Sequence, residues 1–245
     1  MAVVLAALAG CAGMNTNPRD PLEPLNRQVA KFNDDVDAVL LKPVATAYRE
    51  ATPPLVRTGI ANFFGNMGDA WSSVNALLQF KLQDAAENMM RFSFNTVFGF
   101  AGILDIASDL NIERHKEDFG QTLGRWGVPA GPYIVLPLLG PSTLRDAIAL
   151  GLVDRRGDGL HYIHSSWNQD GLYALRVVDQ RANLLRVGNV IDQAALDRYS
   201  FTRDAYLQKR RADIFEDKEL DSDGAEPKLD GTPAPSGQPA SAPKR

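Results

Sequence analysis

The chain has 245 residues, of which 44% are hydrophobic and 23% are charged, and its formal net charge is −4. These proportions are typical of a globular protein with a substantial core, and the acidic balance argues against a nucleic-acid partner, which normally meets a basic face. Cys11 is the only cysteine, which excludes an intramolecular disulfide and any zinc or iron–sulfur site built on clustered cysteines.

The chain begins with an apolar run, residues 1–10, that resembles the hydrophobic part of a signal peptide. No Lys or Arg precedes this run, so the signal peptide is expected to have a truncated start. The run leads into Leu8-Ala9-Gly10-Cys11, which is similar to a lipobox, the signal for acylation of the cysteine. Several acyl chains on Cys11 would anchor the protein durably, with residues 11–19 as a lipidated tether. An unmodified, buried cysteine is the alternative.

Residues 20–216 are predicted to form a single compact all-α domain. Apolar residues recur there at three- and four-residue spacing, and no stretch alternates with the period of a β-strand. Proline in a first helical turn predicts a helix starting near Pro54. Gly65 and Gly68 predict a tight turn that ends this helix before the next one.

Two further amphipathic helices are predicted over residues 170–186 and 192–216. The second carries a basic cluster, for which a solvated helix face is a simpler explanation than a contact with anionic lipid or a partner. Residues 217–245 contain proline, glycine, serine and alanine without apolar periodicity, so they are predicted to form a disordered tail. The basic cluster comprises Arg198, Arg203, Lys209, Arg210 and Arg211.

The segment 80–98 is predicted to be a helix with apolar side chains around most of its circumference. A surface helix carries a narrower apolar stripe, so this helix belongs either in the core or against lipid. The general burial of such side chains favours the core, although adjacent methionines also suit a surface that meets varied acyl chains. Arg91 interrupts the pattern and could pair with an acid or bind a phosphate.

A short apolar run around Pro137 lies between two Gly-Pro pairs. Pro137 disfavours both a helix and a central strand, and the run is far shorter than the roughly 20 residues of a membrane-spanning helix. Two interpretations stay open: a buried turn between helices, and an apolar hairpin that contacts lipid. The residues of this hairpin are Gly131, Pro132, Tyr133, Ile134, Val135, Leu136, Pro137, Leu138, Leu139, Gly140 and Pro141.

The sequence contains no nucleophile elbow, phosphate-binding loop or zinc-protease helix, so no enzymatic activity and no cofactor are expected. The charged segment 111–118 is predicted to be an exposed loop with a solvent-facing His115. The carboxylates at 34–37 lack the rest of a calcium loop, and His161 with His164 lacks a third ligand. We therefore expect no metal site.

Three long strings resemble the VacJ/MlaA family of outer-membrane lipoproteins, in the order that the family has them. They are DPLEPLNRQVAKFN at 20–33, NFFGNMGDAWSSVNALLQFK at 62–81 and FGQTLGRWGVPAGPYIVLPLLGPSTLRD at 119–146. The resemblance extends from about Asp20 to Phe215. Ala12, after the cysteine, is similar to the residue found in lipoproteins sent to the outer membrane.

The resemblance implies a ring-shaped helical platform embedded in the membrane, on the periplasmic side of the outer membrane, with an amphipathic channel through it. It implies that glycerophospholipid misplaced in the outer leaflet passes through this channel to a soluble periplasmic lipid carrier, beside an outer-membrane porin trimer. A lipolytic enzyme and a porin-bracing structural lipoprotein are the alternatives. The expected lipid-path residues are Phe32, Asn33, Phe63, Phe64, Met89, Met90, Phe92, Phe94 and Phe98.

Overall fold

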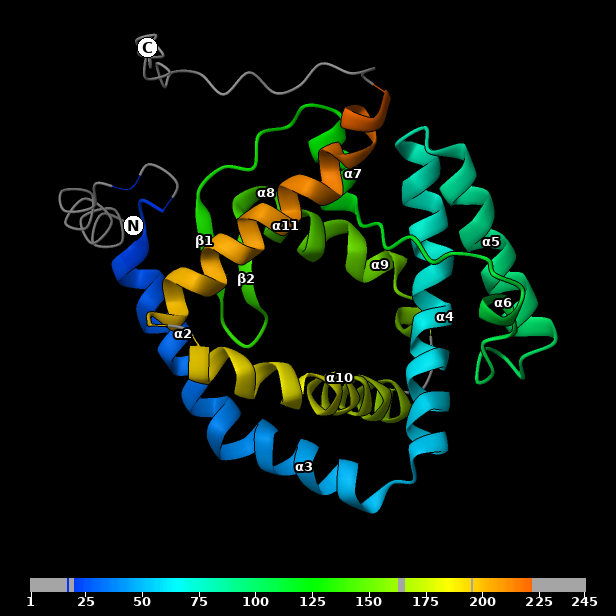
Figure 1. Ribbon diagram of the computed structural model, residues 1–245, viewed down its shortest axis with the longest axis horizontal. Helices are drawn as coiled ribbons and strands as arrows, with labels where there is room; N and C mark the ends of the chain where they lie inside the picture. Colours follow the sequence, from blue (N-terminus) through cyan, green and yellow to red (C-terminus); the bar gives the residue numbers. More distant parts are fainter. Residues whose placement is uncertain (1–16, 18–19, 163–165, 195, 222–245) are drawn as a thin grey trace, which may run out of the picture.

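The helices of this chain are arranged around a central opening (Figure 1). The computed structural model describes residues 17, 20–162, 166–194 and 196–221, so the predicted signal peptide, Cys11 and most of the predicted tail lie outside it. The elements are α2 (Glu23–Val36), η1 (Asp37–Leu41), α3 (Lys42–Ala51), α4 (Pro54–Leu78), α5 (Leu82–Val97), α6 (Ile106–Asp109), α7 (Phe119–Arg125), β1 (Tyr133–Leu136), β2 (Gly140–Thr143), α8 (Leu144–Ala149), η2 (Leu150–Asp154), α9 (Arg155–Gly157), η3 (Gly159–Tyr162), α10 (Ser166–Ala194) and α11 (Arg198–Asp221).

Helices α2 and α3 form one curved arm, because the turn η1 between them is a π-helical turn and not a break. Pro43 lies at the start of α3 and lacks the N–H that an uninterrupted α-helix would need there. A widened π turn is a common way to accommodate such an interruption. Asp37 in this turn pairs with Arg181 of α10 at 2.6 Å, which fixes the bend against the next helix. The arm thus follows the outside of the ring (Figure 1).

Helix α4 continues without interruption through Gly65 and Gly68, so the predicted tight turn is wrong. The structure gives Gly65 a different reason. A Cβ atom at this position would lie 2.8 Å from Nη1 of Arg114, which packs across the helix. Gly65 therefore permits the side chain of Arg114 to approach α4 closely. Helices α4 and α5 pack against each other as an antiparallel pair, connected by the turn at Phe80.

Residues 133–143 form a β-hairpin, one of the two structures that the sequence left open for this run. Strands β1 and β2 are antiparallel, with Tyr133 opposite Thr143 and Val135 opposite Pro141. A two-stranded ribbon has only edge strands, and an edge position tolerates a proline without a donor. Pro137 lies in the connecting turn. The expectation of a hairpin is thus confirmed, and Pro137 lies in neither strand, which agrees with its lack of a backbone donor.

Two asparagines of α2 hold the free edge of β1. The side-chain amide of Asn26 donates to the carbonyl of Tyr133 (3.0 Å), and its oxygen accepts from the N–H two residues later (2.9 Å). Asn33 forms the same pair of hydrogen bonds with the carbonyl of Leu136 (2.9 Å) and the N–H two residues later (2.8 Å). The hairpin is therefore fastened to α2 by side chains that act as a third strand would.

The distribution of polarity in this fold is the reverse of that in an ordinary soluble domain. Exposed apolar side chains include Val39 (81%), Leu55 (87%) and Val97 (71%). Among the described residues, no helix has both the length and the apolarity needed to cross a bilayer. The largest fully buried side chains are Arg91, Tyr133, Leu160, Gln79, Asn75, Asn88, Asn95, Thr122, Thr143 and Asp20.

Helix α5 shows this reversal most clearly. Its buried residues are Ala85, Asn88, Arg91 and Asn95, whereas the pair Met89–Met90 lies on the exposed side. The interpretation of this helix as a core helix is therefore wrong for the methionines, whereas their contact with lipid stays a prediction. The physical reason is that the polar side chains find their partners inside the protein.

Candidate functional site

A polar cavity of about 770 Å³ lies between α4, α7, α10, α11 and the segment 112–118 that precedes α7. A second cavity of about 360 Å³ shares Trp71, Tyr206 and Arg210 with the first and extends toward β2 and η2. The polar side chains that line the first cavity come from both sides of the ring. They include Asn62, Asp69, Arg114, Lys116, Glu117, Asp118, Gln121, Arg176, Asp179, Gln180, Asn183, Lys209, Arg210 and Asp213.

The segment 111–118 is a loop, as predicted, and Asn111, Glu113 and Lys116 are exposed, but the segment also forms one wall of this cavity. Arg114 pairs with Asp69 of α4 at 2.8 Å. Nε2 of His115 lies 2.8 Å from a carboxylate oxygen of Glu87 in α5, so this histidine does not simply face solvent. Hydrogen bonds from Gln83 and then His115 lower the pKa of Glu87.

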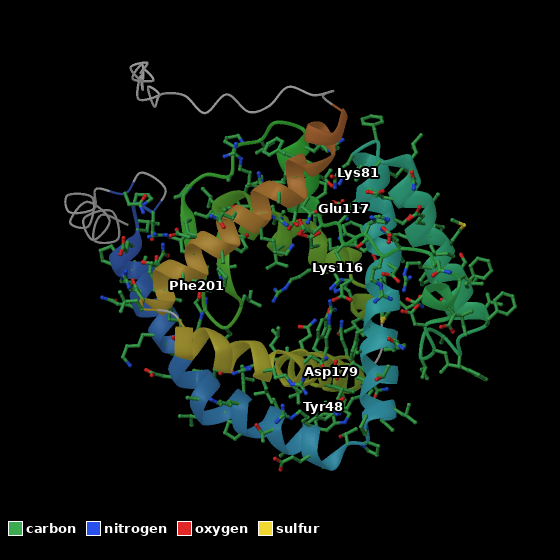
Figure 2. The ribbon with its side chains drawn as sticks, viewed as in Figure 1. Tyr48, Lys81, Lys116, Glu117, Asp179 and Phe201 are labelled. Carbon is green, nitrogen blue, oxygen red and sulfur yellow. The ribbon has the colours of Figure 1, made fainter. Side chains whose placement is uncertain are left out.

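Glu117 fastens the same segment to the turn between α4 and α5. Its carboxylate accepts from Lys81 (2.7 Å) and from Gln79 (2.9 Å), and only 8% of the residue is exposed. Figure 2 shows Lys81 and Glu117 at the top of α4, and Lys116 at the central opening. Glu117 of this charged segment is thus buried because Lys81 supplies an opposite charge.

The second cluster joins α7, α8 and α11 around Asp146. The guanidinium of Arg210 reaches Asp146 (2.9 Å) and Asp118 (2.6 Å), and the hydroxyl of Tyr206 donates to Asp146 (2.9 Å). Burial raises the pKa of Asp146, but Arg210 and Arg145 outweigh it and hold that pKa below its usual value. Arg145 also pairs with Asp146, at 2.9 Å.

Glycines of α7 make room for this cluster. A Cβ atom on Gly120 would lie 2.5 Å from Oδ1 of Asp146, and one on Gly124 would lie 2.7 Å from Nη1 of Arg145. The two glycines therefore allow the charged side chains of α8 to approach α7 closely. The basic cluster predicted as a solvated face is only partly so, because Arg203 and Arg210 turn inward to carboxylates.

Arg91 forms the centre of a third buried cluster, between α5, α4 and α6. Its guanidinium lies 2.7 Å from Asp105 and 3.5 Å from Asp69, and only 2% of the residue is exposed. Burial raises the pKa of Asp69, against the lowering effect of Arg114 and Arg91. Of the two roles considered for Arg91, pairing with acids is the one that the structure shows.

On the opposite wall, Asp179 of α10 accepts from the Tyr48 hydroxyl (3.0 Å) and from Asn183 (3.2 Å). Figure 2 shows Tyr48 and Asp179 between α3 and α10. Burial raises the pKa of Asp179, although both hydrogen bonds act to lower it. The pKa of Tyr48 rises to about 12 through burial and the adjacent carboxylate.

An apolar groove of about 490 Å³ meets the polar cavity at Phe64, which lines both. Phe63 and Phe64 contact each other edge to face, with ring centroids 5.4 Å apart. The polar cavity and the groove together offer adjoining surfaces of opposite polarity. The groove is lined by Leu55, Val56, Gly59, Ile60, Phe63, Phe64, Ile103, Leu172 and Leu175.

The structure does not gather the other expected lipid-path residues at this junction. Asn33 holds the hairpin, and Phe32 is 52% exposed on α2. Phe94 and Phe98 stack on α5 with centroids 5.9 Å apart. Met89, Met90 and Phe92 belong to the same helix. A role of these residues in a lipid path therefore stays a prediction.

Three large, exposed apolar residues of the described chain adopt a left-handed backbone conformation that normally favours glycine. They are Phe80 (φ 62°, 84% exposed), Phe100 (φ 51°, 74% exposed) and Leu138 (φ 63°, 63% exposed). Each lies in a turn, where a glycine would cost less.

The predicted absence of a metal at His161 and His164 stays a prediction, because His164 lies outside the described residues. Within the described part of the chain, no group of three or more potential ligands could hold a metal ion.

Comparison with known proteins decides the family, since residues 18–213 match the family described as MlaA lipoprotein. The chain belongs to this family. It is 34% identical over 219 residues to the intermembrane phospholipid transport system lipoprotein MlaA of Escherichia coli (strain K12), covering 85% of each chain. The protein of the same description from Haemophilus influenzae is 33% identical over 231 residues, covering 88% of this chain and 89% of the relative.

A solved structure described as the structural basis for maintenance of bacterial outer membrane lipid asymmetry is similar in fold. The TM-score is 0.70 at 34% identity, covering 80% of this chain and 98% of the other. The MlaA resemblance of the three sequence strings and the predicted helical fold are thus both confirmed. The sequence did not predict the acidic and basic side chains that line the cavity. Their partners lie on segments far apart in the sequence, so no local pattern indicates the pairs.

Proposed function

We propose that this MlaA-family chain is an outer-membrane lipoprotein that removes mislocalised glycerophospholipid from the outer leaflet and maintains lipid asymmetry. The observation that carries the proposal is the reversed polarity of the fold, with a polar cavity inside and apolar side chains outside. The relatives support this function, since one is named for phospholipid transport and the similar solved structure is described by the maintenance of lipid asymmetry. Residues 20–216 are the transport domain, held on the periplasmic side by an acylated Cys11.

The exposed apolar side chains support a location within the lipid. A soluble monomer rarely exposes large contiguous apolar areas, yet here exposed apolar residues occur on α2, α4 and α5 as well as on the hairpin. The three strained apolar turn residues, Phe80, Phe100 and Leu138, add a conformational cost that contact with acyl chains would offset. The ring would therefore lie in one leaflet, because no described helix could span both.

A phospholipid has a charged headgroup and apolar chains, so its path needs both kinds of surface. The polar cavity replaces the hydration of the headgroup with fixed charges and amides, and the groove at Phe64 accepts an acyl chain. This passage requires no covalent chemistry. The lipid would then reach a soluble periplasmic carrier, with an outer-membrane porin trimer as the membrane partner of the ring.

Filling the cavity tests this proposal. Gly68 lines both polar cavities, and a Cβ atom there meets nothing within 4 Å, so Gly68→Phe places a ring in the path without a backbone clash. Gly171 of α10 has the same free space but does not line these cavities, which makes Gly171→Phe the matched control. The readout is phospholipid on the cell surface, labelled with a membrane-impermeant amine reagent.

We expect Gly68→Phe to accumulate surface phospholipid as a deletion strain does, and Gly171→Phe to match the wild type. Equal surface phospholipid in all three strains that express the protein would contradict the proposal. Accumulation of lysophospholipid and fatty acid by purified protein would instead support a lipolytic enzyme. Porin binding without any effect of deletion on surface lipid would support a structural brace.

A further inference from the structure

All but one of the described cations that line the polar cavity form an ion pair with a carboxylate. Arg114 pairs with Asp69 (2.8 Å), Arg176 with Asp158 (2.6 Å), and Arg210 with Asp118 (2.6 Å).

Lys209 likewise pairs with Asp213, at 2.7 Å. Among the described residues that line this cavity, Lys116 is the cation with no carboxylate within ion-pairing distance. Its side chain lies at the central opening (Figure 2). In a cavity where the other cations are matched, the unmatched charge is available to a ligand.

The backbone that carries Lys116 is held firmly on both sides. The carbonyl of His115 accepts from Asn88, and its N–H donates to the same side chain (2.8 and 3.1 Å). Glu117 is fixed by Lys81, as described above, and its N–H donates to Ser72 (3.2 Å). Lys116 therefore projects from an ordered segment whose neighbouring side chains are already used. A positioned cation loses less freedom when it binds an anion.

The cavity also has the surroundings that such an anion needs. It is lined by neutral donors, including Asn62, Gln180 and Asn183, which could complete the hydrogen bonds of phosphate oxygens. At Phe64 it adjoins the apolar groove. A molecule with a phosphate in the cavity and an alkyl chain in the groove would satisfy both surfaces.

We propose that Lys116 binds the phosphate of a phospholipid in the polar cavity and selects phosphate-bearing lipids over neutral lipids with the same chains. This inference rests on the proposed function and adds the residue that recognises the substrate class. Ammonium groups bind phosphate as compact point charges, and such charge-assisted hydrogen bonds are stronger than neutral ones. The other lining cations hold the walls together, whereas Lys116 meets the lipid.

The test measures binding to the full-length protein, purified in a neutral detergent and delipidated. The ligands are dioctanoyl phosphatidylglycerol, dioctanoylglycerol, which has the same chains without phosphate, and inorganic phosphate. Binding is followed by tryptophan fluorescence, to which Trp71 in the cavity wall contributes. The variants are Lys116→Gln, the conservative Lys116→Arg, and Lys209→Gln, which removes a paired cation from the same cavity.

We expect Lys116→Gln to weaken the binding of phosphatidylglycerol about tenfold, which is the effect of losing one hydrogen bond to a charged group. The binding of dioctanoylglycerol should stay unchanged. The dissociation constants of Lys116→Arg and Lys209→Gln for phosphatidylglycerol should stay within about threefold of the wild-type value. Equal binding of phosphatidylglycerol by wild type and Lys116→Gln would overturn the inference and leave the proposed function standing.

Two further outcomes have separate meanings. If inorganic phosphate alone binds and depends on Lys116 while neither lipid binds, the ligand is free phosphate and the assignment to lipid is overturned. If the wild type binds none of the three ligands, the proposed function fails together with the inference. Circular dichroism of each variant confirms that the helical fold is retained.

Discussion

The two faces of α5 are oriented in the opposite way to those of an ordinary amphipathic helix on a soluble protein. The inner face buries Asn88, Arg91 and Asn95, all hydrogen-bonded to neighbouring segments. The outer face exposes Met89 and Met90. The helix is amphipathic in the usual way, but its polar side faces the protein. The apolar or polar character of a helix face therefore does not by itself determine whether that face is buried or exposed.

The largest expected effect comes from the inner face. Arg91→Met leaves Asp105 and Asp69 without their shared buried cation, which should lower the free energy of unfolding by about 3–5 kcal/mol. The measurement is chemical denaturation in a neutral detergent. Met90→Gln on the outer face is the control and should change stability by less than about 0.5 kcal/mol. Comparable losses in both variants would remove the distinction between the faces.

Asp146→Asn should have the next largest effect, about 2–4 kcal/mol at neutral pH, since it leaves Arg210 with one fewer buried partner. The folded-state pKa of Asp146 lies below the ordinary 3.8. Its stabilisation is therefore present above about pH 4 and is lost as the pH falls through the lower, folded-state pKa. Unfolding free energies measured from neutral to acidic pH should show a steeper acid loss for the wild type than for the variant. Parallel curves would argue against this ion pair.

The hairpin should respond to Asn33→Ala. This change removes the hydrogen bonds from α2 to the Leu136 carbonyl and the Leu138 N–H, and should cost about 1–2 kcal/mol locally. Hydrogen exchange at the Leu138 amide is the measurement, and faster exchange is expected. Gln28→Ala, an exposed change on the same helix, is the control. Unaltered exchange in Asn33→Ala would show that the hairpin holds itself.

The smallest effect separates stability from membrane binding. Phe80→Gly relieves a left-handed phenylalanine and should raise stability by about 0.5–1 kcal/mol, while weakening binding to phosphatidylglycerol vesicles. The matched control is Phe98→Gly, because Phe98 is also exposed but has φ −99° and gains nothing from glycine. This control should lose both stability and vesicle binding. Unchanged vesicle binding by both would contradict lipid contact at these turns.

Periodicity predicted the helices, because these depend on local patterns. The hairpin was one of two interpretations of the run around Pro137, and the ring was implied only by the family resemblance. The side of α5 that is buried could not be predicted, since burial statistics assume that water lies outside. The inward ion pairs of Arg114, His115 and Glu117 were missed for the same reason, because charges in a loop usually face water. The role of Gly65 depends on Arg114, a partner distant in the sequence, so only the folded chain reveals it.

The most direct test of the reversed polarity measures what surrounds each face. In the Cys11→Ser chain, spin labels at Val97 on the outer surface and at Gln180 in the cavity wall are placed in phospholipid vesicles. Paramagnetic relaxation then compares oxygen, which enters lipid, with a water-soluble nickel chelate. We predict oxygen contact at Val97 and nickel contact at Gln180. Equal nickel contact at both positions would show that the apolar surface faces water and would contradict the account.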